Sequence, residues 1–477
     1  MKFRVDTARA ADPHHLLESH GAHHPPIDAV AVNGTSGYRL AEVVQNWGLS
    51  NFPRWGAFAV ETGAAKIEVT RSNAAGKPFW MTELQGGHGS SGLYQSPHMR
   101  PRDIRLWNWL AVAGGAKGVI YWTYHAEATG SEATGFGLVD RDGSSTERVR
   151  EAAKDNQLIQ AHWDILQDYL PKPEVAILTD QDNAILAYAM AGNEDVSTQS
   201  FRGYYKAVWN MDLWADFIEP SSLGKADYKF LIAPWHLMGK KDTCAELLRY
   251  VEGGGTLLLE TCFGMFDEQC IYNPVVPPYG LAEAFGYREK EGYYQQARSE
   301  SGPLAALLGP SVQPLAEDIY FQPEIEFTEP LSIRVKAHTY VTPVEITSAT
   351  RIATCQGLAV AARKKVGQGQ VYYVGTNLGA SITAGNATGI DLLRAMVRQV
   401  VRPAISSNKL RPRLIEGRNR SLLAVFNDTA ADQAEHIAIP SRFRRIKDIH
   451  SQKELRLQNN SVLVSVPYQD AVVLLLE

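Results

Sequence analysis

The 477-residue sequence is poor in cysteine, and its four cysteines are Cys244, Cys262, Cys270 and Cys355. Their spacing fits neither a disulfide framework nor a CxxC metal knuckle, so we expect free thiols and neither a bound metal nor a cofactor. Few cysteines are typical of a reducing compartment, and the opening "MKFRVDTARAADPHHL" lacks the apolar core of a signal peptide. If Met1 is the true start, the sequence predicts a cytoplasmic protein.

Long apolar runs and an excess of positive charge are also missing. No segment approaches the roughly 20 apolar residues of a membrane-spanning helix. The formal net charge is -5 with both signs interspersed, which leaves no basic stripe to neutralise phosphates. We therefore expect neither a membrane nor a nucleic acid as partner. A hydrophobic content of 45% is typical of globular proteins, and the length suggests two or three domains.

The first third of the chain alternates short apolar stretches with amphipathic ones. This pattern predicts parallel strands joined by helices, with the strands at residues 15–22, 42–53, 78–84 and 118–125. One intervening helix is predicted to end at Gly114 and Gly115. The next is predicted to open with a capping box from Ser144 to Glu147. The segment "LPKP" at residues 170–173 breaks the pattern and marks a boundary.

The pattern then changes twice. From Glu174 strands and helices alternate as far as "TLLLET" (256–261), which predicts a doubly wound α/β sheet. A hairpin turning at residues 367–369 and a helix over 389–401 follow. From about Ser406, short alternating runs predict a small antiparallel β-sandwich. We therefore expect three domains, at residues 1–171, 172–404 and 405–477.

Four segments together resemble a known family. They are "KPFWMTELQGG" (77–87), "WLAVAGGAKGVIYW" (109–122), "GFGLVDRDGSSTERVRE" (135–151) and "LLRYVEGGGTLLLET" (247–261). In this order they resemble the second half of the glycoside hydrolase family 42 β-galactosidases. The resemblance implies a (β/α)8 TIM barrel, then a Rossmann-like trimerisation domain similar to class I amidotransferases, then a C-terminal β domain. It also implies a retaining hydrolase of terminal β-D-galactosides that assembles as a homotrimer.

Only half of the barrel is expected in this sequence. A full barrel needs eight strands, whereas the first domain yields four, which the resemblance equates with strands five to eight. The family carries its catalytic acid/base in an Asn-Glu pair at the end of strand four, and no such pair precedes Glu83. We interpret the chain as a fragment or a truncated gene product. A barrel completed by another polypeptide is the alternative.

Glu83 ends an apolar strand and is followed by Gly86 and Gly87. Retaining glycosidases use two carboxylates about 5 to 5.5 Å apart, and barrel enzymes carry their chemistry at the carboxyl ends of the strands. By itself, an acid at a strand end would equally suit an ion pair with an arginine. The resemblance implies that Glu83 is the nucleophile.

The resemblance also implies two sugar-binding residues. Trp122 would lie under the apolar face of the pyranose, with core packing as the alternative for this ring. Glu132 would hydrogen-bond sugar hydroxyls. The sequence departs from the family where Gly135 replaces a histidine, and where a tryptophan is missing from the loop after Glu83. These departures leave a β-fucoside or an α-L-arabinopyranoside open as substrate beside a β-galactoside.

Two other motifs suggest different chemistry. The first is a histidine cluster made of His14, His15, His20, His23 and His24. Adjacent histidines on a strand point to opposite faces, so we expect no metal there, and predict that His20 lines the sugar cleft. The second, "LLLETCFG", resembles the cysteine turn of class I amidotransferases. Because Glu260 replaces a glycine and no His-x-Glu follows, we expect Cys262 to be a buried thiol.

The segment "CIYNPVVPPYG" (270–280) is too apolar and proline-rich for a purely solvated loop. Such a stretch usually marks an interface, although it can also cap its own domain. With the resemblance, it predicts a homotrimer. The rival to the glycosidase is a catalytically inactive remnant that serves assembly or sugar binding.

Overall fold

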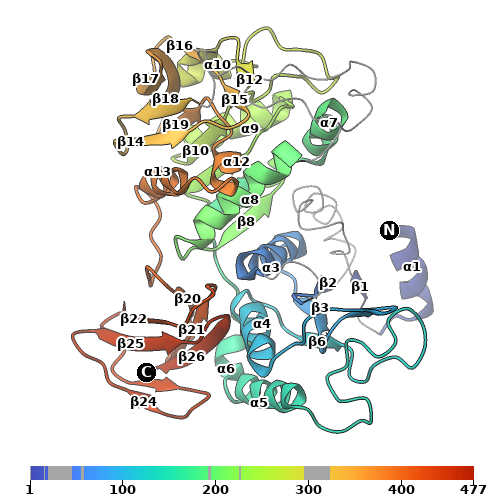
Figure 1. The fold of residues 1–477 in the computed structure, drawn as a ribbon. Coiled ribbons are helices and arrows are strands. Elements are labelled where there is room, and N and C mark those ends of the chain that lie inside the picture. Colours follow the sequence, from blue (N-terminus) through green and yellow to red (C-terminus); the bar gives the residue numbers. More distant parts are fainter. Residues whose placement is uncertain are drawn as a thin grey trace.

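A computed structural model of the chain describes residues 2–14, 17–19, 46–54, 59–191, 195–224, 227–294 and 323–477. Three parts are visible in Figure 1: a parallel sheet with helices at lower right, a larger α/β part at the top, and antiparallel strands at lower left. The described residues contain no helix that is both long and apolar enough to span a bilayer.

The first part contains a sheet of four parallel strands in the order β1-β2-β3-β6. Its strands are β1 (Glu18–Ser19), β2 (Asn46–Asn51), β3 (Phe79–Gln85) and β6 (Val119–Trp122), and its helices are α1 (Lys2–Ala11), α3 (Val60–Ala74), α4 (Pro101–Ala113), α5 (Glu147–Ala161) and α6 (Trp163–Leu166). Each strand overlaps one of the four predicted ranges. Because all pairings are parallel, the carboxyl ends of the strands share one edge of the sheet, where barrel enzymes carry their active sites.

The helix ends follow from their capping residues. In α4, Pro101 occupies the first turn and the Asp103 carboxylate accepts the backbone N–H of Arg100 at 2.7 Å. Helix α5 begins two residues later than the predicted capping box. Thr146 is its N-cap, and the Thr146 hydroxyl accepts the backbone N–H of Val149 at 3.3 Å. The prediction of Ser144 as the cap is therefore wrong.

The second part is built on a nine-stranded sheet in the order β14-β13-β17-β18-β19-β10-β9-β7-β8. Its strands are β7 (Val175–Leu178), β8 (Ala215–Ile218), β9 (Phe230–Ala233), β10 (Thr256–Glu260), β13 (Glu324–Phe327), β14 (Ile333–Lys336), β17 (Thr350–Cys355), β18 (Leu358–Val366) and β19 (Gly369–Val374). The half from β19 to β8 is parallel, and the half from β14 to β18 is antiparallel. The antiparallel extension beyond the β18–β19 hairpin was not anticipated from the sequence.

Helices cover both faces of the parallel half. They are α7 (Gln181–Ala191), α8 (Asp195–Trp209), α9 (Lys241–Glu252), α10 (Leu281–Phe285), α12 (Leu378–Thr383) and α13 (Ala387–Val397). Leu258 of β10 packs in the core that contains Tyr204 of α8, whereas its neighbour Leu257 packs with Leu247 of α9. Successive residues of a strand point to opposite faces, so the sheet lies between two helical layers, as the predicted doubly wound arrangement requires.

The third part is antiparallel. A five-stranded sheet has the order β20-β21-β26-β23-β24, and β22 pairs with β25. The strands are β20 (Arg411–Ile415), β21 (Ser421–Asn427), β22 (Gln433–Ala438), β23 (Ile446–Asp448), β24 (Glu454–Leu455), β25 (Ser461–Val466) and β26 (Asp470–Leu476). Leu423 and Leu474 of the larger sheet share a core with Val462 and Val464 of the smaller pair.

Side chains before and at the start of β26 reach back to helix α4 of the first part. Arg100 Nη2 donates to Gln469 Oε1 at 3.2 Å, and Arg105 Nη1 donates to Asp470 Oδ2 at 3.4 Å. The third part therefore packs directly on the helix between β3 and β6.

Candidate active site

Glu83 lies near the carboxyl end of β3 at a β-bulge. Leu49 of β2 pairs with Met81 and Ser50 pairs with Glu83, so Thr82 is an extra residue on β3. A bulge changes the direction of the side chains that follow it. The Ser50 hydroxyl donates a hydrogen bond of 2.7 Å to Glu83 Oε2, which holds the half-buried carboxylate beside the end of β2.

The loop after Glu83 packs closely on the segment at residues 136–138. A Cβ added at Gly87 would lie 2.3 Å from the carbonyl oxygen of Gly137, so only glycine fits. Arg148 of α5 binds both sides of this contact, since its Nε donates to Gly86 O at 3.1 Å and its Nη2 to Gly137 O at 3.0 Å. Helix α5 of the first part thus holds the backbone beyond Glu83 in place.

Trp122 and Glu132 contact each other at the end of the neighbouring strand. Trp122 Nε1 donates to Glu132 Oε2 at 3.2 Å. In the sheet Trp122 pairs with Gln85, two residues beyond Glu83, so the structure places Glu83 and Trp122 near the ends of adjacent strands and Glu132 in the loop after β6. The fourth, His20, lies outside the described residues. Neighbouring Tyr124 is 65% exposed and is not a core residue.

At Gly135, where the family has a histidine, close packing leaves no room for a side chain. A Cβ at Gly135 would lie 2.5 Å from the Ser90 Cβ. Ser90 belongs to the hairpin of β4 (Ser90–Ser91) and β5 (Tyr94–Gln95), which is joined to the loop that carries Glu132: Ser90 Oγ donates to Ala133 O at 3.0 Å. The short hairpin after Glu83 therefore occupies the space that a side chain at residue 135 would need.

Comparison with known proteins agrees with this geometry. Residues 46–161 match the family described as "Beta-galactosidase", and residues 173–295 match the "Beta-galactosidase trimerisation domain". Together the two matches cover half of the chain. The chain belongs to glycoside hydrolase family 42. The first match contains β3, β6 and their loops, and the second begins just before β7.

Individual family 42 relatives extend beyond this chain. The β-galactosidase bgaB of Geobacillus kaustophilus is 28% identical over 204 residues, which are 42% of this chain and 30% of bgaB. The β-galactosidase BglY of Alicyclobacillus acidocaldarius is 24% identical over 367 residues, or 72% of this chain and 49% of BglY. The chain therefore spans half or less of these curated relatives.

Solved structures of family 42 enzymes share the fold of this chain and also extend beyond it. A catalytic mutant of Gan42B, a family 42 β-galactosidase from G. stearothermophilus, superposes with a TM-score of 0.77 at 18% identity. The match covers 98% of this chain and 65% of Gan42B. The β-galactosidase from Bacillus circulans sp. alkalophilus gives a TM-score of 0.75 at 20% identity, over 92% of this chain and 61% of that one. The mixed α/β fold is thus the fold of family 42 enzymes.

Two features of the candidate site were not anticipated from the sequence. The first is Ser50, the hydrogen-bond partner of Glu83. It stands near the end of the predicted strand at residues 42–53, and parallel strands end at the same edge of a sheet, which was the available signal. The rings of His88 and His98 lie 4.8 Å apart at the loop after β3. Partial burial, together with nearby His98, lowers the pKa of His88. No sequence signal paired these two histidines.

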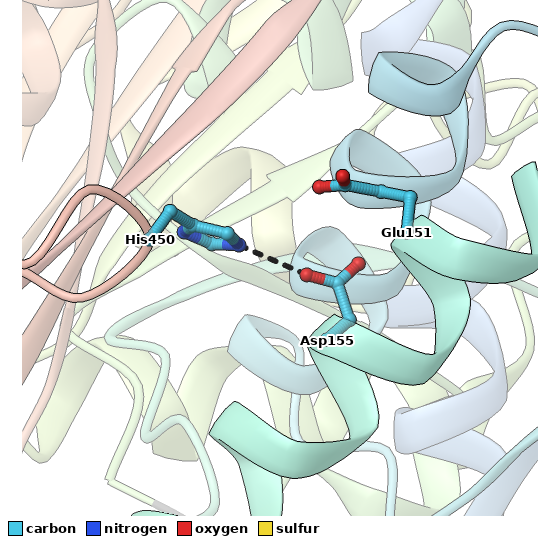
Figure 2. A group of neighbouring side chains, drawn as sticks. All are labelled: Glu151, Asp155 and His450. Atoms are coloured by element: carbon cyan, nitrogen blue, oxygen red, sulfur yellow. Dashed lines mark hydrogen bonds and ion pairs between the residues drawn. The ribbon is translucent and has the colours of Figure 1, made fainter. Parts of the chain in front are cut away.

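Three side chains elsewhere have a geometry that a metal ion can use. The ligand atoms of Glu151, Asp155 and His450 lie within 4.8 Å of one another (Figure 2). However, the Arg105 guanidinium already binds Glu151, with Nε 2.6 Å from Oε1. A fixed positive charge at this place opposes a second cation. We therefore interpret the group as a polar contact between α5 and the third part.

Cys262 is 2% exposed, which confirms the predicted buried thiol. Its φ of +67° resembles a nucleophile turn, but burial raises the pKa of the thiol, so the thiolate is disfavoured. The departure at Glu260 has a structural explanation. The Glu260 carboxylate accepts the backbone N–H groups of Trp235 at 2.9 Å and Gly379 at 2.8 Å, and so links β10 to the turn after β9 and to the first turn of α12.

Proposed function

We propose that the chain contributes the nucleophile half of a retaining β-galactosidase site, with Glu83 as the nucleophile. The observation that carries this proposal is that Glu83 and the Trp122–Glu132 pair lie at the carboxyl ends of the adjacent strands β3 and β6. In this assignment Glu83 attacks the anomeric carbon and displaces the aglycone, whose oxygen takes a proton from the acid/base, and water then hydrolyses the glycosyl-enzyme. The Trp122 ring supports the sugar and Glu132 binds its hydroxyls. His20 lies outside the described residues, and its place in the same cleft stays a prediction.

The acid/base would come from a further barrel strand. Among the described strands, β6 stands at the end of its sheet with one edge unpaired. Beside it, a cavity is lined by apolar side chains that include Val112, Val119, Ala152 and Ile159. These features support residues 1–171 as strands five to eight of a TIM barrel that another stretch of polypeptide completes. The same proposal assigns residues 172–404 to the Rossmann-like trimerisation domain and 405–477 to the C-terminal β-sandwich domain.

A covalent probe tests the nucleophile without requiring a full catalytic cycle. An aryl 2-deoxy-2-fluoro-β-galactoside carries a good leaving group, so attack by a carboxylate needs little acid assistance. We expect slow labelling of the purified chain, with the adduct mapped to Glu83 by peptide mass spectrometry. Glu83→Gln should leave the thermal midpoint nearly unchanged and abolish the adduct, and unmodified lactose should not be hydrolysed.

Other results would redirect the assignment. An adduct on a different carboxylate would overturn the role of Glu83. A chain that binds galactose but never forms an adduct would support the inactive sugar-binding remnant instead. Faster labelling by the matching fluoro-β-fucoside or α-L-arabinopyranoside would change the substrate while keeping the mechanism.

The homotrimer is proposed on the exposure of the segment at residues 270–280. Ile271 is 63% exposed, Tyr272 60% and Tyr279 43%. Three large apolar side chains on one exposed loop favour an interface, and a closed ring of three pairs every heterologous patch. The cytoplasmic location, which was inferred from the few cysteines and the opening residues, stays a prediction.

A further inference from the structure

Asp155 is a fully buried carboxylate at the contact between helix α5 and the third part of the molecule. It is held by three donors from two other segments. Asn108 Nδ2 and Trp109 Nε1 of α4 donate to its two oxygens, each at 2.9 Å. His450, in the turn between β23 and β24, contacts Asp155 Oδ1 through Nε2, also at 2.9 Å (Figure 2). Since a carboxylate only accepts, His450 is the donor in this bond.

The hydrogen-bonded chain continues from Asp155 to strand β6. Asn108 is 3% exposed, and while its amide nitrogen binds Asp155, its Oδ1 accepts the Tyr121 hydroxyl at 2.8 Å. Tyr121 immediately precedes Trp122, and alternate residues of a strand point to opposite sides. The outward-facing Tyr121 is therefore fixed to α4, while Trp122 is left to reach Glu132. His450, Asp155, Asn108 and Tyr121 form one continuous path to the proposed sugar-binding tryptophan.

This path matters because one edge of β6 has no strand partner among the described residues, although the Gly86 N–H donates to the Trp122 carbonyl at 2.8 Å on the other side. Among the described strands, it pairs only with β3. A buried carboxylate that loses a donor must recover the lost interaction by shifting or by admitting water. His450 Nδ1 has no hydrogen-bond partner among the described residues, so the imidazole is fixed by its bond to Asp155 and by an edge-to-face contact with the Trp109 ring, whose centroid is 5.9 Å away. Loss of His450 will thus be transmitted through Asn108 to Tyr121.

We propose that His450, a residue of the C-terminal β domain, is a positioning residue of the catalytic site, which acts on Trp122 through Asp155, Asn108 and Tyr121. The inference rests on the proposed function for its consequence in sugar binding. The positioning itself is a property of the folded chain and can be measured without a sugar. This assigns to the C-terminal domain a part in forming the site.

The test follows the Trp122 indole directly. The chain is labelled with 5-fluorotryptophan, and Trp122→Phe identifies the 19F resonance of Trp122 among those of the ten tryptophans. In His450→Ala, which removes the donor, we expect the Trp122 resonance to shift or broaden. In His450→Gln, whose amide can still donate to Asp155, we expect it to return toward its wild-type position. His436→Ala is the matched control, because His436 lies exposed on β22 of the same domain.

A double-mutant cycle then checks the path. Asn108→Ala should move the Trp122 resonance as His450→Ala does, and the double variant should show no additional shift, since both changes interrupt one chain. An unchanged Trp122 resonance in His450→Ala, with the thermal midpoint confirming a folded chain, would overturn the proposal. Shifts of all ten resonances in His450→Ala and in His436→Ala alike would overturn it too, because they would reflect general destabilisation.

Measuring the affinity for galactose tells a failure of this inference apart from a failure of the proposed function. If the wild-type chain binds galactose, we expect roughly a tenfold weaker Kd in His450→Ala and no change in His436→Ala. If the wild-type chain binds no galactose, the proposed sugar site fails, while the 19F measurement still decides the positioning. If the wild-type chain binds galactose and His450→Ala binds it equally well, the positioning role of His450 is wrong and the proposed sugar site is retained.

Discussion

Single buried or half-buried carboxylates hold several parts of this molecule together. Glu289, in β11 (Tyr287–Glu289), accepts the backbone N–H of Cys262 at 3.0 Å. Burial raises the pKa of Glu289 to about 8, and it raises the pKa of Glu260 to about 7. These acids bind protons in the folded protein at pH values where an unfolded chain has released them, so their protonation is coupled to folding.

Glu289→Gln should reveal this coupling as a dependence of stability on pH. Between pH 4.5, the ordinary pKa of a glutamate, and about 8, the folded state holds one more proton at this site than the unfolded state. Its contribution to the free energy of unfolding therefore falls as pH rises, by at most about 1.4 kcal/mol per pH unit. A glutamine stays neutral and avoids this loss.

Thermal unfolding between pH 5 and 8 measures the effect. The midpoint of Glu289→Gln relative to wild type should increase steadily across this range. Glu291→Gln, at an exposed position two residues away, is the control and should show no such trend. A constant difference between Glu289→Gln and wild type would contradict the raised pKa.

At the scale of elements, the site depends on how two loops fit together after β3 and β6. The glycines after Glu83 allow the loop to contact residues 136–138, and Arg148 ties the contact to α5. Gly87→Ala should therefore cost roughly 1 to 3 kcal/mol, the range for overpacking a close contact. Gly224→Ala is the matched control, since an added Cβ there meets nothing within 4 Å.

The expected readout is a lower thermal midpoint for Gly87→Ala and an unchanged one for Gly224→Ala. The probe reaction at Glu83 should slow in Gly87→Ala as well, because the backbone next to the nucleophile must move. Equal midpoints for the two variants would mean that the loop yields easily and that the glycine is not required by packing.

The elements themselves were largely predictable, and the contacts between them were not. Period-two and helical patterns located the strands around Glu83 and Trp122, because apolar residues are concentrated in both strands, even though Ile120 of β6 is 47% exposed. The bulge at Thr82 and the Thr146 cap depend on register and backbone angles, which hydrophobic spacing does not encode. Asn108 and His450 reach their partners only through tertiary packing, so no local pattern marked them, whereas the place of Ser50 in a predicted strand was its only signal.

At the scale of the whole molecule, assembly is the property to test. A charge at Ile271, which is 63% exposed on the segment proposed as the interface, should disrupt a trimer without disturbing the monomer fold. We expect Ile271→Asp to shift the mass in light scattering from trimer toward monomer at micromolar concentration. Leu463→Asp is the matched control, since Leu463 is 51% exposed on β25, away from that segment.

The wild-type chain and Leu463→Asp should then give the same trimeric mass. Residues 171–477, expressed alone, should also run as a trimer if the first part is dispensable for assembly. If the wild-type protein is monomeric at tens of micromolar, residues 270–280 are not an interface and instead cap their own domain.

The contact of Gln469 with Arg100 also has a consequence for synthesis on the ribosome. The two residues are 369 positions apart in the chain. Helix α4 thus emerges long before the turn that covers it, and at about 5 to 20 residues per second the interval lasts roughly 20 to 70 seconds. Throughout that time the newly made first part exposes the surface that β26 later buries. Nascent chains of this protein should therefore engage chaperones until translation has passed β26.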